Sequence, residues 1–166
     1  MKFLFYGIWL IVLSILQPTL MRDISVFGVA PNLFLCFVIV IGFLRGKNEG
    51  AVVGGIFGLM YDLLIGRLIG VNCLIYLYLG LGAGILSQSF FSGGKKLFAV
   101  LSTAVATLIA ALVYYVALRF SLGEVSFATV FFRIGILEAI YNAIMAFLIM
   151  YPIKGMLKLM RITPAL

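Results

Sequence analysis

Two acidic residues, Asp62 and Glu138, lie inside apolar stretches of this 166-residue chain, and they are the side chains best placed to do chemistry. A pair of carboxylates can act as general acid and base or bind a metal ion, provided that a nucleophile or further ligands converge on them. The chain has no histidine, and its two cysteines, Cys36 and Cys73, lie in apolar runs where free thiols pack as small hydrophobes. We therefore predict that the protein is not an enzyme and has no catalytic residue, no metal site and no cofactor.

The composition is that of an integral membrane protein. Apolar residues make up 65% of the chain and charged residues 10%, and the mean hydropathy is +1.28. A bilayer core about 30 Å thick takes roughly 17 to 25 helical residues per crossing, so the chain has room for about six crossings. The predicted fold class is all-α, a polytopic bundle of six transmembrane helices that forms a single domain over residues 1–166. The predicted crossings are Phe3 to Met21, Ala30 to Leu44, Gly50 to Ile65, Ile69 to Ser89, Leu97 to Leu118 and Phe132 to Tyr151.

Lysine and arginine are distributed unequally between the two sides of such a bundle. One side has eight of them, namely Lys2, Arg45, Lys47, Lys95, Lys96, Lys154, Lys158 and Arg161, and the other has four, namely Arg22, Arg67, Arg119 and Arg133. Positive charge is retained in the cytoplasm, so both termini are predicted to be cytoplasmic, and the apolar N-terminal run is expected to stay attached as the first crossing. The net charge of +7 then reflects topology and attraction to anionic lipids rather than binding of nucleic acid.

Glycines recur at every fourth position of the third predicted crossing. Gly50, Gly54 and Gly58 lie on one side of that helix, and Asp62 continues the same side. Small residues with this spacing let a second backbone approach closely inside a membrane, where dispersion and weak hydrogen bonds replace the hydrophobic effect. The sequence leaves open whether the second helix belongs to the same bundle or to another protein.

Asp62 itself has several possible roles. It could pair with Arg67, it could receive backbone N–H groups of the turn at 68–72, or it could bind a partner or substrate.

Two further pairs of polar residues share a helix face at i, i+4. Asn72 and Tyr76 form one pair in the fourth crossing, and Glu138 and Asn142 form the other in the last. Polar side chains inside a membrane point toward other helices, so these four residues are predicted to make polar contacts within the bundle.

A basic tail follows the last crossing. Lys154, Lys158 and Arg161 alternate with apolar residues after Pro152, a spacing that favours a short helix over 152–166 in the cytoplasmic interface, in contact with lipid headgroups.

Several local motifs occur in a distinctive order. They are Gln17-Pro18, Phe27 to Leu33, Arg45 to Gly50, Gly54 with Gly58 to Asp62, Leu68 to Asn72, and Glu138 to Asn142. In this order they resemble the MreD family of bacterial rod-shape-determining membrane proteins, most densely between Gln17 and Gly84. One departure is Pro31-Asn32, where the family often has Pro-Asp.

The resemblance implies a non-enzymatic scaffold of the cell-elongation machinery in the bacterial inner membrane. MreD-like proteins are thought to bind the single-span protein MreC, and to link MreB filaments through it to RodA and its penicillin-binding partner. The family is also said to share its six-helix fold with the substrate-binding S components of ECF vitamin transporters, which supplies the alternative function. From the resemblance to MreD we expect an MreC helix to dock on this bundle, with the glycine groove and Asp62 contributing contacts or shaping the docking surface.

Overall fold

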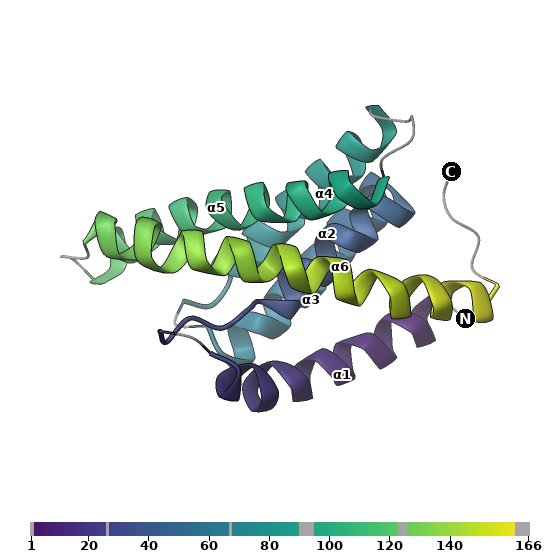
Figure 1. The fold of residues 1–166 in the computed structure, drawn as a ribbon, viewed down its shortest axis with the longest axis horizontal. Helices are drawn as coiled ribbons and strands as arrows, with labels where there is room; N and C mark the ends of the chain where they lie inside the picture. Colours follow the sequence, from purple (N-terminus) through teal and green to yellow (C-terminus); the bar gives the residue numbers. More distant parts are fainter. Residues whose placement is uncertain (1, 26, 67, 90–94, 123–125, 162–166) are drawn as a thin grey trace.

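The computed structural model describes residues 2–25, 27–66, 68–89, 95–122 and 126–161. All the elements formed by these residues are helices, which confirms the predicted all-α class (Figure 1). They are α1 (Lys2–Asp23), α2 (Leu33–Arg45), α3 (Lys47–Leu64), α4 (Val71–Ser89), α5 (Lys95–Leu122), the π-helical segment η1 (Thr129–Gly135) and α6 (Ile136–Leu159).

Four helical segments are long and apolar enough to cross a membrane, and they correspond to α1, α4, α5 and η1 with α6. The number of crossings stays a prediction, because α2 has only 13 residues and would extend about 20 Å.

α2 forms the centre of the bundle. Every side chain from Leu33 to Phe43 is buried, because α3, α4, α5 and α6 all pack around this short helix. Gly46 adopts a φ of +86° directly after α2, a conformation that a residue without a side chain tolerates, and α3 begins at the next residue. The two helices are thereby joined by a sharp turn, and the Phe37 ring of α2 stacks on the Phe57 ring of α3 with 4.8 Å between centroids.

The glycines of α3 contact the backbone of α4. A Cβ atom added at Gly50, Gly54 or Gly58 would lie 2.4, 2.2 or 2.4 Å from the carbonyl oxygen of Gly80, Tyr76 or Asn72, respectively. Successive contacts are four residues apart on each helix, and they run forward along α3 but backward along α4. The two helices are therefore antiparallel and pack with their backbones in contact. The second helix in the groove is α4 of the same chain, and this corrects the expectation that an MreC helix docks there, because α4 already fills the space.

The end of the chain differs from the predicted arrangement. α6 continues through Pro152 to Leu159, where an interfacial helix separate from the last crossing was expected. Ile153 and Leu157 are buried in the core of the bundle, so burial of apolar surface on both sides of the proline holds the helix together. Residues 162–166 of the predicted tail lie outside the described residues.

α1 lies at the edge of the bundle and packs mainly on α2 and α3. Its beginning lies at the same end of the molecule as the end of α6 (Figure 1). The ends of α1, α3 and α5 lie toward the opposite end.

The backbone packing of α3 on α4 predicts that neighbouring glycines differ in their tolerance of a methyl group. Gly54→Ala should lower the free energy of unfolding by about 1–3 kcal/mol, because its Cβ would overlap the Tyr76 carbonyl. Gly55→Ala is the matched control, since its Cβ would meet only a Leu77 methyl group at 3.5 Å. Unfolding of the purified protein by sodium dodecyl sulfate measures the free energy of unfolding of both variants. Equal losses in the two variants would contradict the proposed register.

Candidate functional site

Asp62 caps the beginning of α4. Its Oδ2 accepts hydrogen bonds from the backbone N–H groups of Gly70, at 2.9 Å, and Cys73, at 3.0 Å, and its Oδ1 accepts one from Asn72 Nδ2 at 2.8 Å. The side chain is buried, and the positive end of the α4 dipole favours its negative charge. The sequence left three roles open for Asp62, and this geometry matches the one in which its carboxylate receives backbone N–H groups of the turn at 68–72. The alternative partner Arg67 lies outside the described residues.

Asn32 is the centre of a second polar cluster, at the beginning of α2. Its Oδ1 accepts a hydrogen bond from the Leu35 N–H and caps α2, while its Nδ2 donates to the Tyr76 hydroxyl at 2.6 Å. Its backbone N–H donates to Oδ1 of Asn142 at 2.6 Å. An amide side chain can accept and donate at once, which an ionised aspartate cannot do, so asparagine suits this position next to a tyrosine hydroxyl.

Side chains from three more elements extend this cluster, which we call the Asn32 junction. Gln17 of α1 accepts a hydrogen bond from the Leu33 N–H through its Oε1 and donates one to the Pro31 carbonyl through its Nε2, each at 2.8 Å. Asn142 of α6 donates to Thr107 of α5 at 3.0 Å. Hydrogen bonds thus join α1, α4, α5 and α6 to the beginning of α2, and the participating side chains are Gln17, Asn32, Tyr76, Thr107 and Asn142.

The structure places the four predicted polar residues at two neighbouring sites. Tyr76 and Asn142 belong to the Asn32 junction, Asn72 contacts Asp62, and Glu138 lies beside Asn32 and Asn142. Thr107 was missed by sequence analysis. The sequence feature that could have identified Thr107 is its i, i+4 spacing from Thr103. Each threonine hydroxyl donates a hydrogen bond to the carbonyl four residues earlier, so both hydroxyls have partners within an apolar helix.

Two cavities adjoin the Asn32 junction. One has a volume of about 300 Å³ and is lined by Asn32, Tyr76 and Thr107 among others, and the second, of about 520 Å³, is lined by Gln17 and by residues 28–30 of the connection from α1 to α2. Both are lined by Tyr61, Ile65, Ile134 and Glu138.

Glu138 is half-buried between these cavities. Among the residues that the structure describes, no lysine or arginine forms an ion pair with it. The arrangement offers a carboxylate, three side-chain amides and hydroxyl groups around open space, which suits binding of a donor-rich group. No group of three or more metal-ligating side chains occurs in the described ranges.

A comparison with protein-family models gives a match to rod shape-determining protein MreD over residues 1–161. The chain belongs to the MreD family. No curated protein and no solved structure matches it. Membership in the family implies a role in determining rod shape, as a structural membrane protein of a family that is not known as enzymatic.

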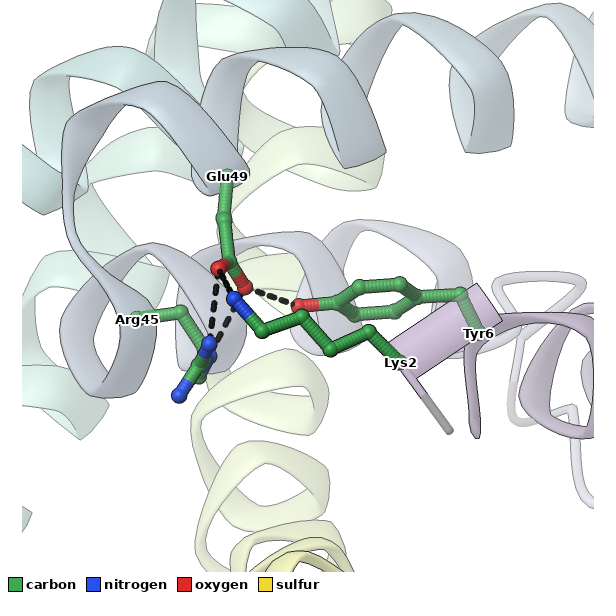
Figure 2. A network of polar contacts seen from close by, with 4 residues as sticks. All are labelled: Lys2, Tyr6, Arg45 and Glu49. Carbon is green, nitrogen blue, oxygen red and sulfur yellow. Dashed lines mark hydrogen bonds and ion pairs between the residues drawn. The ribbon is translucent and has the colours of Figure 1, made fainter. Parts of the chain in front are cut away.

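The opposite end of this MreD-family bundle carries an ionic cluster, which Figure 2 shows. Arg45 donates to both carboxylate oxygens of Glu49 at 2.7 Å, Lys2 donates to Oε1 at 2.9 Å, and the Tyr6 hydroxyl donates to Oε2. We call these four residues the Glu49 cluster. It connects the beginning of α1 to the turn between α2 and α3.

Glu49 precedes the first residue of the predicted third crossing. Burial raises the pKa of its carboxyl group, but hydrogen bonds from Arg45, Tyr6 and Lys2 outweigh burial and lower the pKa to about 2. Glu49 is therefore ionised at physiological pH. Sequence analysis did not single out this cluster, although its members form two i, i+4 pairs, Lys2 with Tyr6 and Arg45 with Glu49.

The residues predicted to contact lipid headgroups also lie at this end, with Lys154 and Lys158 in the last turns of α6 and Arg161 just after it. Lys158 and Arg161 are exposed and Lys154 is half-buried. Lys96 of α5 lies over the Tyr151 ring, 5.1 Å from its centroid.

The cap on α4 predicts the effect of removing the Asp62 carboxylate. Asp62→Ala should lower the free energy of unfolding by about 1–3 kcal/mol, because N–H groups of the turn before α4 would lose their acceptor in a buried place. Asp23→Ala removes an exposed carboxylate at the end of α1 and should change stability little. Unfolding in detergent, followed by circular dichroism, measures both variants. A stable Asp62→Ala protein would show that the cap is dispensable.

Proposed function

We propose that this MreD-family chain is a non-enzymatic scaffold of the cell-elongation complex in the bacterial inner membrane, with both termini in the cytoplasm. In this proposal it binds MreC directly, and through MreC it links MreB filaments to the peptidoglycan synthases RodA and its penicillin-binding partner. Membership in the MreD family supports a role in rod shape and is the source of the partner names, and the geometry that follows supports only where on the bundle a partner would bind.

The observation that carries the proposal is the pair of cavities beside the Asn32 junction. They lie at the end of the bundle that contains the connections from α1 to α2 and from α3 to α4, which the distribution of lysine and arginine predicts to face outward. A scaffold that connects the cytoplasm to cell-wall synthases must contact its partner on that outer side. The glycine groove is filled by α4, so these cavities replace it as the proposed contact.

The chemistry of the cavities indicates what the partner presents. Glu138 lies between them without a cationic partner in the described part of the chain, and Asn32 and Tyr76 line the smaller one. A lysine, an arginine or a free backbone N–H of the segment just outside the MreC transmembrane helix would complement the carboxylate. Apolar side chains of that segment would pack on Ile65 and Ile134.

Cavity filling and charge removal test this contact. Ile134→Trp should fill both cavities and Glu138→Gln should remove the charge, and each should reduce co-purification with affinity-tagged MreC at least about tenfold. Ile144→Trp is the matched control on α6, because Ile144 is exposed and lines neither cavity. Amounts of each variant in the membrane are compared by immunoblot.

Growth of a rod-shaped bacterium that depends on the variant provides the functional readout. Cells with Ile134→Trp or Glu138→Gln should become round, while cells with Ile144→Trp should stay rod-shaped. If both cavity variants insert normally, retain MreC and support rod shape, the cavities are not the contact.

The same cavities favour one alternative, a substrate-binding S component of an ECF-type transporter, because such a protein needs a ligand cavity at its outer end. A vitamin or similar small molecule in the denatured extract of the purified protein, detected by mass spectrometry and lost in Ile134→Trp, would support it. An empty extract together with loss of MreC binding favours the scaffold.

A further inference from the structure

A separate groove runs between α1 and α3, beside the Glu49 cluster. It has a volume of about 460 Å³, and its walls are almost entirely apolar. The wall residues are Gly7 and Leu10 of α1 and Val52, Val53, Ile56 and Phe57 of α3, while Lys2, Tyr6, Asn48 and Glu49 lie at one end. No part of the proposed MreC contact overlaps with these residues.

The groove exists because α1 rests on α2 through a different face. Phe5, Trp9 and Leu13 are buried, and the Trp9 ring lies 5.3 Å from the Phe37 ring of α2. Gly7 lies off this face and has no side chain to reach α3, so a Cβ added there would find no atom within 4 Å. α1 is thus held at its beginning by the Glu49 cluster and along one face by α2, which leaves space toward α3.

The end of the groove carries positive charge. The Glu49 cluster contains two cations and one carboxylate, and Arg45 alone binds both oxygens of that carboxylate. Lys2 donates one hydrogen bond to Glu49, and its side chain is 57% exposed, so its ammonium group has further N–H donors that face outward. Lys47, the first residue of α3, is exposed and lies two residues before Glu49 in the chain, so it adds a third cation to this end of the bundle.

We propose that this groove binds one anionic phospholipid, with an acyl chain along Leu10, Val52 and Ile56 and its phosphate on Lys2. The apolar walls match an acyl chain, and the net positive end matches an acidic headgroup. A partner helix about 10 Å wide is a poorer occupant, because the hydrogen bonds from Lys2 and Tyr6 to Glu49 close the groove at this end. The lipid would fill the space between α1 and α3 and so hold α1 in place.

Native mass spectrometry of the full-length protein, titrated with phosphatidylglycerol or with phosphatidylcholine of the same acyl chains, tests the proposal. The wild type should bind phosphatidylglycerol more tightly. Gly7→Leu should weaken that binding at least about tenfold, the equivalent of displacing two buried CH₂ groups, without a clash in the bundle. Lys2→Gln should weaken phosphatidylglycerol binding about fivefold and remove the preference for phosphatidylglycerol over phosphatidylcholine. Lys2→Arg should retain that preference.

Gly82→Leu is the matched control. Gly82 also has no atom within 4 Å of an added Cβ, and the groove beside it, between α4 and α5, contains no charged residue, so phosphatidylglycerol binding should be unchanged. Equal binding of the two lipids by the wild type, or undiminished phosphatidylglycerol binding by a folded Gly7→Leu protein, would overturn the proposal. A Gly7→Leu protein that elutes as an aggregate is replaced by Val52→Trp, which narrows the groove from the exposed side of α3.

Discussion

Inside a bilayer no water competes for polar groups, so a buried donor or acceptor without a partner in its own helix is costly unless another segment of the protein supplies one. This constraint explains the Asn32 junction. Pro31 disfavours a helical conformation of the residue before it, and α2 begins only at Leu33, so the backbone groups of residues 31–33 lack helical partners. Gln17 of α1 and Asn142 of α6 provide their hydrogen bonds. The same constraint explains why Asp62 lies at the beginning of α4, where N–H groups of the preceding turn have no carbonyl partner. Polar side chains therefore fix where the helices meet, and apolar side chains fill the space between those points.

The bundle depends, second, on the backbone contact between α3 and α4. It needs glycine at each crossing point, because even one methyl group would enter the space of a carbonyl oxygen. With the two helices so close, Asp62 reaches the turn before α4, and Tyr76 reaches Asn32 on α2. The polar contacts and the glycine packing thus depend on one another, and loss of either would separate the same elements.

The two ends of the bundle differ in chemistry in a way that suits a scaffold. At one end an ionic cluster with excess positive charge adjoins the beginning of α1, and at the other end cavities with a carboxylate and amides adjoin the connections from α1 to α2 and from α3 to α4. A membrane protein that joins a cytoplasmic assembly to an outer one needs distinct surfaces at the two ends. Asp62 and the glycines, which look like a binding site in the sequence, instead hold the interior together.

The sequence by itself determined the helical class, the approximate helix positions and the family, because apolar runs of membrane length and glycines at every fourth position act through local periodicity. It also indicated that Tyr76 and Asn142 would point inward. Which helix fills the glycine groove, that Asn32 joins α2 to Tyr76 and Asn142, and that Lys2 meets Glu49 were decided only by the tertiary structure. Each of these contacts joins residues far apart in the chain, and their proximity depends on how the other five α-helices pack around α2, which no local pattern encodes.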